Sequence, residues 1–355
     1  MCSSDLVRLA REGIRPSHIM TPAAFENAIR VLHALGGSTN AVVHLPAIAG
    51  RLGIKLPLDL FDSLSRTTPW LANLRPSGRY QMEQFFEAGG VPVLMKELEV
   101  LLHGDALTVT GLTVGENLSM VEPVGNREAA SQRRVREVIS SREEPLDAEG
   151  GLAIVRGTLA PDGAVIKTVA ASSHLQKHRG RALVFTSPAE MQAAADDLEL
   201  DVTPDDILVL QNAGPVGAPG MPEIGNLPIP RKLLRQGVRD MVRISDARMS
   251  GTAFGTIILH VAPESAIGGP LAAVRTGDII ELDVEARRLD LMVEPAEIAR
   301  RLAVRVVAPP PFRRGYGKLF VEHVMQAPDG CDFDFLLGDP DDAISAARMG
   351  RDLRT

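Results

Sequence analysis

The stretch GLAIVRGTLAPDGAVIKTVAAS, residues 151–172, marks the point at which the hydrophobic pattern of the chain changes. Two short apolar runs containing β-branched residues lie on either side of a Pro-Asp-Gly turn. Apolar runs that flank a tight turn predict two antiparallel strands. We therefore expect a β-rich module to begin near residue 150.

Further apolar runs after this hairpin predict more strands. They are RALVFTS, DILVLQNAG, DMVRISDA, GTIILHVAP and GDIIELDVEARRLDLMV. Two short helical segments, PAEMQAAADDL and PRKLLRQG, interrupt them. The pattern favours a β-barrel domain with peripheral helices over residues 150–310, rather than a doubly wound sheet, and a tail over 311–355.

The chain before residue 145 has a helical pattern. In TPAAFENAIRVLHALGG, Thr21 suits an N-cap, Pro22 suits the first helical position, and Gly36 ends the run. The segment STNAVVHLPAIAGRLGI predicts a second helix that begins at Ser38 or Thr39. Residues 7–145 are therefore expected to form the first domain, with a charged helix or linker at its end.

Composition restricts the class of protein. The chain has 355 residues, 45% hydrophobic, with 38 basic and 45 acidic side chains and a net charge of −7. This balance disfavours nucleic-acid binding, and no apolar run reaches the roughly 18 residues of a membrane span. The start lacks a signal-peptide pattern, and Cys2 and Cys331 are too far apart to indicate a disulfide framework. We expect a cytoplasmic protein.

One loop between two predicted strands is unusually rigid. LQNAGPVGAPGMPEIGNLPIP, residues 210–230, holds four glycines, five prolines and a single carboxylate, Glu223. Proline and glycine turns can hold a side chain at low entropic cost, and a carboxylate suits a hard cation such as Mg²⁺. On spacing alone, a solvated turn residue is the favoured alternative for Glu223.

A second loop, ISDARMSGTAFGT at residues 244–256, also lies between predicted strands. Ser250 can act as a base if a nearby metal lowers the pKa of its hydroxyl, and Gly255 would permit close approach of a ligand. The G-x-S-x-G elbow of hydrolases is absent from the sequence, which disfavours an acyl-enzyme serine. A plain turn serine is the favoured alternative.

A third motif, GGSTN at residues 36–40, begins a predicted helix. Backbone N–H groups and hydroxyls at a helix start predict a site for a carboxylate or phosphate. Helix capping by Ser38 and Thr39 explains the same residues. The histidines show no metal-binding spacing and are interpreted as structural.

Taken together, six segments resemble the dihydroxy-acid and sugar-acid dehydratase family, which includes phosphogluconate dehydratase. They are GGSTNAVVHLPAIAGRLG, PSGRYQMEQFFEAGG, GGLAIVRGTLAPDGAVIK, NAGPVGAPGMPE, VRDMVRISDARMSGTAFGT and GGPLAAVRTGDIIELDV. The forms PSGRY, GMPEIGNLPIP and SDARMSGTAFGT are closer to the arabinonate and xylonate branch. The resemblance implies that a 2,3-dihydroxy acid loses water to give a 2-keto-3-deoxy acid.

The resemblance also implies cofactors and residue roles. An iron–sulfur cluster, [2Fe–2S] or another type, would act as Lewis acid on the departing hydroxyl, and Mg²⁺ would hold the substrate. Glu223 matches the metal-binding glutamate, and Ser250 matches the serine that removes the C2 proton. Ser38, Thr39, Asn40 and Thr252 would lie near the substrate.

Departures from the family pattern are equally informative. The family's cluster cysteines and its other Mg²⁺ ligands belong to an amino-terminal region that has no counterpart here, and neither Cys2 nor Cys331 matches them. We therefore expect the carboxy-terminal part of a dehydratase, inactive alone: an incomplete α/β domain followed by a barrel similar to the mobile domain of aconitase-like enzymes. The resemblance implies a homodimer or homotetramer at full length. Alternatives are a branched-chain dihydroxy-acid dehydratase and a non-catalytic binding or assembly module.

Overall fold

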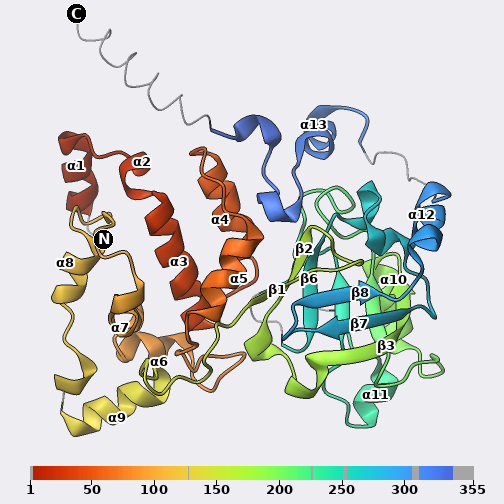
Figure 1. The fold of residues 1–355 in the computed structure, drawn as a ribbon, viewed down its shortest axis with the longest axis horizontal. Helices are drawn as coiled ribbons and strands as arrows, with labels where there is room; N and C mark the ends of the chain where they lie inside the picture. The colour runs from red at the N-terminus through yellow and green to blue at the C-terminus, as the bar shows by residue number, and fades with distance from the viewer. Residues whose placement is uncertain (1–2, 127, 225–226, 251–253, 306–311, 339–355) are drawn as a thin grey trace, which may run out of the picture.

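The computed structural model describes residues 3–126, 128–224, 227–250, 254–305 and 312–338. Helices make up the first part of the chain and a mixed sheet the second, side by side (Figure 1). The helices before the sheet are α1 (Ser3–Glu12), α2 (Pro16–Ile19), α3 (Pro22–Leu35), α4 (Ala41–Gly50), α5 (Leu58–Arg66), α6 (Met82–Glu87), α7 (Gly90–Glu97), α8 (Val114–Ser119) and α9 (Ala129–Val138). This agrees with the predicted helical character of the first part.

The strands follow the predicted apolar runs. They are β1 (Ala153–Val155), β2 (Gly163–Ile166), β3 (Lys177–Phe185), β4 (Ile207–Leu210), β5 (Arg243–Ser245), β6 (Ile257–Ala262), β7 (Ile279–Asp283) and β8 (Arg288–Leu291). The later helices are α10 (Pro188–Asp196), α11 (Arg231–Arg235), α12 (Pro295–Ala303) and α13 (Gly315–His323). The predicted hairpin is confirmed, because β1 and β2 pair antiparallel.

The eight strands form one mixed sheet in the order β1-β2-β6-β5-β4-β3-β7-β8. Pairs at both ends of this order are antiparallel, whereas β6, β5, β4 and β3 are parallel neighbours. An isolated bridge between Arg156 and Arg288 brings the end of β1 to β8. The sheet therefore nearly closes into a barrel, with β-strands and helices combined as in an α/β protein.

The start and the end of α3 are those predicted. Thr21 Oγ1 accepts the backbone N–H of Ala24 at 3.3 Å, and Pro22 is the first helical residue. Gly36 ends the helix with φ of 59°, and a Cβ there would lie 2.9 Å from Trp70 Nε1. A side chain at residue 36 would therefore be strained by the backbone and would clash with the indole.

The second helix begins later than predicted. Helix α4 starts at Ala41, and residues 39 and 40 form a turn. Ser38 Oγ accepts the N–H of Asn40 at 3.2 Å, which favours this turn over further helix. The consequence is that Asn40 projects from a turn between two helices.

Helices α3 to α5 pack against one face of the sheet. Ile29 and Phe61 share a buried core with Ile154 and Leu259 of the strands. On the inner side of the sheet, a second core contains residues from each of the strands β1 to β8. A third core lies among the helices and includes Leu71, and it does not reach the strands.

An ion pair network also joins the helices to the sheet. Arg287 donates from Nε to Asp62 Oδ1 and from Nη2 to Glu149 Oε2, both at 2.7 Å. The Arg287 side chain is 13% exposed, so these pairs are screened from solvent more than ordinary surface pairs.

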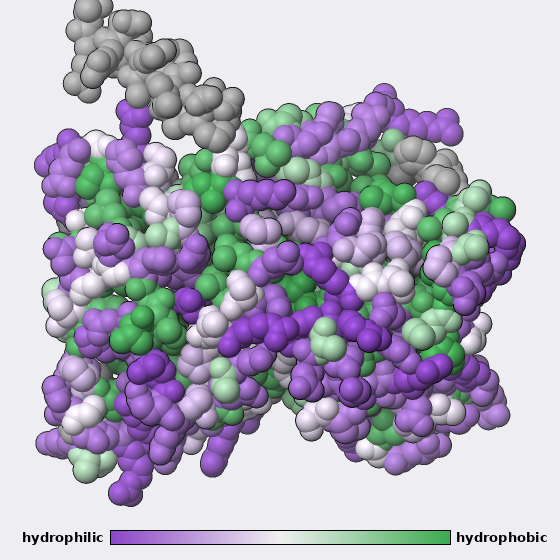
Figure 2. Space-filling model, in the orientation of Figure 1, coloured by the Kyte–Doolittle hydropathy of each residue, from purple (hydrophilic) through white to green (hydrophobic). Residues whose placement is uncertain are grey.

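The surface is hydrophilic over β3, β7 and β8 (Figure 2). Lys177 pairs with Asp283 at 2.9 Å there. Elsewhere apolar side chains are exposed, among them Phe86 on α6 at 82% and Val100 at 72%. Within the described part of the chain, no helix has both the length and the apolar character that a membrane span requires.

Candidate active site

The loop that carries Glu223 is held at its start by a buried carboxylate. Asp246 Oδ1 accepts the backbone N–H of Ala213 at 2.9 Å, and Oδ2 accepts the N–H of Ser265 at 2.8 Å. The Ser265 hydroxyl donates to the same Oδ2 and accepts the N–H of Asn212 at 2.6 Å. Asp246 therefore links the loop after β5 to the loop that carries Glu223.

A second buried carboxylate holds the next turn of the same loop. Glu264 accepts the N–H groups of Val216 and Gly217, both at 2.9 Å, and the side-chain amide of Gln326 at 2.8 Å. A Cβ on Gly214 would lie 2.6 Å from Glu264 Oε2, so glycine is required there. Burial raises the pKa of Glu264, whereas these donors lower it.

A buried arginine ties the ends of both loops together. Arg243 donates to the carbonyls of Leu227 and Phe254 at 2.9 and 3.1 Å, and pairs with Asp240 at 3.1 Å. The protein itself also requires glycine at residue 255. A Cβ on Gly255 would lie 2.1 Å from Arg243 Nη2, so the guanidinium occupies that space.

The turn before α4 meets the rigid loop directly. Asn40 Nδ2 donates to Glu223 Oε1 at 2.6 Å, although the two residues are 183 positions apart. The N–H of Ile224 donates to the carbonyl of Arg248 at 3.2 Å, which fixes the backbone beside Glu223. Glu223 itself is exposed, whereas Asn40 Oδ1 is buried and has no hydrogen-bond partner among the described residues.

Thr39 and Ser250 also come together. Both line a small cavity of about 20 Å³ with Lys167, between the start of α4 and the loop after β5. Thr39 is 6% exposed and Ser250 is partly buried. Thr252, the remaining predicted substrate-binding residue, lies outside the described residues.

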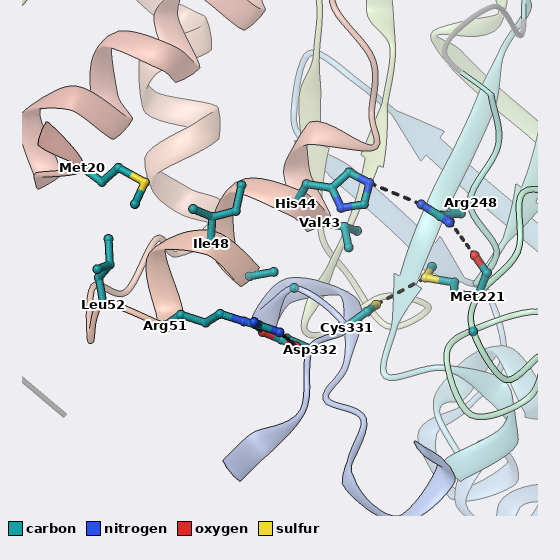
Figure 3. A pocket seen from close by; sticks show the side chains of 13 residues that line it. Met20, Val43, His44, Ile48, Arg51, Leu52, Met221, Arg248, Cys331 and Asp332 are labelled. Atoms are coloured by element: carbon teal, nitrogen blue, oxygen red, sulfur yellow. Dashed lines mark hydrogen bonds and ion pairs between the residues drawn. The ribbon is translucent and has the colours of Figure 1, made fainter. Parts of the chain in front are cut away.

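A larger cavity of about 540 Å³ opens beside the same loops (Figure 3). His44 on α4 points toward Arg248, with Nε2 and Nη1 separated by 3.4 Å. Arg248 Nε donates to the carbonyl of Met221 at 2.5 Å. Apolar side chains of α4, such as Val43 and Ile48, line part of the cavity, and the Arg51–Asp332 ion pair lines another part.

Among the described residues, Glu223 could supply one carboxylate ligand to a magnesium ion, whereas Cys331 does not fit an iron–sulfur cluster. Glu223 offers a carboxylate beside the unpartnered Asn40 oxygen, and hard cations prefer such oxygens. Clusters bind cysteine thiolates. Burial raises the pKa of the Cys331 thiol to about 12, and its Sγ lies 3.3 Å from Met221 Sδ, so it does not fit as a cluster ligand. Cys2 lies outside the described residues.

Sequence reasoning placed most of this site but missed two contributors. Glu223, Ser250, Thr39 and Asn40 were each singled out, and the structure brings them to one end of the sheet, as Asn40–Glu223 and Thr39–Ser250 neighbours. Lys167 was missed because it reads as the end of a strand. In the sequence, Asp246 is one of several polar residues of its loop, and nothing there indicates that it holds the neighbouring loop.

A carboxylate in contact with an amide, and two hydroxyls that line a small cavity, are polar groups of the kind that orient a small molecule in a ligand site. Residues 137–331 match the C-terminal region of dihydroxy-acid/6-phosphogluconate dehydratases, and residues 1–117 match the N-terminal region. The chain therefore belongs to the dihydroxy-acid/6-phosphogluconate dehydratase family, as the sequence motifs indicated.

The names of similar proteins refer to two kinds of substrate, sugar acids and dihydroxy acids. The chain is 52% identical to an L-arabonate dehydratase of Azospirillum brasilense, over 95% of this chain and 58% of the relative. It is 50% identical to an L-arabinonate dehydratase of Rhizobium leguminosarum bv. trifolii, over 94% and 56%. A dihydroxy-acid dehydratase of Acidothermus cellulolyticus is 43% identical, over 92% and 56%. The chain thus spans less than two thirds of the length of these relatives.

Proposed function

We propose that this chain is part of a hydro-lyase that converts a sugar acid into a 2-keto-3-deoxy acid. The observation that carries the proposal is the convergence of Asn40 and Glu223 beside Ser250 and Thr39. Identity of 52% and 50% to L-arabonate and L-arabinonate dehydratases, against 43% for a dihydroxy-acid dehydratase, favours an aldonate substrate.

In the proposed reaction each residue has a distinct task. Glu223 would hold Mg²⁺, which when bound stabilises negative charge on the substrate carboxylate and 2-hydroxyl. Asn40 fixes the Glu223 carboxylate through its 2.6 Å hydrogen bond. Ser250, as an alkoxide, receives the C2 proton and becomes a hydroxyl, the C–H electron pair forms the C2–C3 double bond, and hydroxide leaves C3. The resulting enol tautomerises to the keto acid.

The chain alone is proposed to give no turnover. Glu223 is the one carboxylate that the described residues bring next to Asn40, and Cys331 does not fit a cluster. A Lewis acid for the departing hydroxyl would then have to be held by groups beyond those described.

A chimera tests the substrate class. This chain would replace its matching segment in the Azospirillum L-arabonate dehydratase, and keto-acid formation with Mg²⁺ would be measured on L-arabonate and on a branched-chain dihydroxy acid. We expect product from the aldonate at a rate at least tenfold above that from the branched-chain acid, a difference of about 1.4 kcal/mol.

Other outcomes favour other functions. Preference for the branched-chain acid would support a biosynthetic dihydroxy-acid dehydratase. A folded chimera that forms no keto acid from either substrate, beside an active parent enzyme, would support a non-catalytic binding module. The unmodified chain, assayed in parallel, is expected to form no product.

A further inference from the structure

One amine in the candidate site has no task in the reaction described so far. Lys167 follows β2 directly, and its side chain is partly buried. Burial lowers the pKa of Lys167 to about 8. Among the described residues its ammonium group makes no hydrogen bond or ion pair, although buried lysines are nearly always paired.

The amine shares a cavity with two hydroxyls. Thr39, Lys167 and Ser250 supply the polar side chains of the 20 Å³ cavity, and the other lining residues, Ala170, Gly255, Ile257 and Leu259, are glycine or apolar. A volume of this size holds about one water molecule. The Ser250 hydroxyl and the Lys167 amine can therefore exchange a proton directly or through one water.

Charged groups on neighbouring elements are engaged elsewhere. Asp240 accepts from Thr256 and pairs with Arg243, and Glu223 accepts from Asn40. None of these charges contributes to the lowered pKa of Lys167, which results from burial alone. The neutral amine, which can accept a proton, is thus well populated near pH 8.

We propose that Lys167 is a positioning residue that acts through Ser250, accepting the serine proton during the elimination. As Ser250 Oγ takes the C2 proton, its own proton passes to Lys167 Nζ, so that the serine ends as a hydroxyl and the lysine as an ammonium. The C–H electron pair forms the C2–C3 double bond and hydroxide leaves C3. The ammonium then releases its proton, and this proton and the hydroxide together form one water molecule. This inference rests on the proposed role of Ser250 as base.

Serine reactivity in the purified chain tests the inference without turnover. Methanesulfonyl fluoride sulfonylates an activated serine and releases fluoride and a proton, and peptide mass spectrometry locates the product. We expect Ser250 to react faster than the exposed Ser63, with a rate that rises through a midpoint near pH 8.

Three variants make the test specific. Lys167→Met and Lys167→Arg should both slow the Ser250 reaction by at least about 100-fold and abolish the midpoint, because neither side chain accepts a proton near pH 8. Lys177→Met, which removes an exposed lysine on β3, should change neither rate nor midpoint. If circular dichroism shows that Lys167→Met is unfolded, the Ser250 reaction rate in Lys167→Arg tests the inference instead.

The inference is overturned if Ser250 reacts no faster than Ser63, or if both Lys167 variants keep the wild-type rate and midpoint. Failure of the proposed function looks different. If Ser250 depends on Lys167 but the chimera forms no keto acid, the proton relay stands and the assigned reaction does not.

Discussion

At the scale of single residues, the sequence identified side chains but not their partners. Glu223 and Ser250 stood out because each lies in a loop of unusual composition. The 2.6 Å contact between Asn40 and Glu223 could not be predicted, since 183 residues separate them and the fold alone brings them together. Lys167 was missed for a related reason: its burial depends on residues far away in the sequence.

His33 makes a pH-dependent contribution to stability that can be tested at this scale. It lies at 2.9 Å from the Phe61 carbonyl, and burial lowers the pKa of His33 to about 4. The folded protein therefore resists protonation below the ordinary histidine pKa of about 6.5. The free energy of unfolding should fall as the pH falls from 6.5 to 4, by about 3 kcal/mol from this residue.

His33→Gln should reduce this pH dependence, because glutamine can still donate to the Phe61 carbonyl but does not titrate. Urea unfolding between pH 7 and pH 4 measures how the free energy of unfolding depends on pH. The buried His260, whose pKa is lowered to about 3, leaves a remaining slope. His18→Gln, at an exposed position, is the control. An unchanged slope in His33→Gln would show that His33 does not titrate in this way.

At the scale of elements, the two functional loops are held by buried side chains of the sheet. Asp246 and Glu264 accept backbone N–H groups of the rigid loop, and Arg243 donates to carbonyls at the ends of both loops. The proline and glycine content predicts a rigid loop. It gave no sign of these anchors, because they lie on other segments.

Glu264→Gln tests the anchoring. The new amide would place N–H donors against the N–H groups of Val216 and Gly217, leaving buried donors unsatisfied. We expect a loss of about 2–4 kcal/mol in the free energy of unfolding and faster hydrogen exchange in residues 213–221. Glu281→Gln, in a partly exposed pair with Arg179, should cost less than about 1 kcal/mol. Equal effects of the two variants would contradict the anchoring.

At the scale of the whole molecule, the apolar runs predicted the strands, and Gly36 predicted the end of α3. The strand order could not be predicted, because β4 and β6 have the same fully buried pattern and pairing depends on long-range packing. The predicted barrel character agrees with a sheet whose ends meet at the Arg156–Arg288 bridge. The parallel centre of the sheet was not foreseen.

The central claim is that Glu223 and Ser250 carry separate steps of one elimination. Steady-state kinetics of the chimera with Ser250→Ala and Glu223→Gln, over a range of Mg²⁺ concentrations, test it most directly. The claim predicts that Ser250→Ala lowers kcat at least about 100-fold at unchanged Mg²⁺ dependence, whereas Glu223→Gln raises the Mg²⁺ concentration needed for half-maximal activity. Wild-type kcat in Ser250→Ala, or unchanged Mg²⁺ dependence in Glu223→Gln, would contradict it.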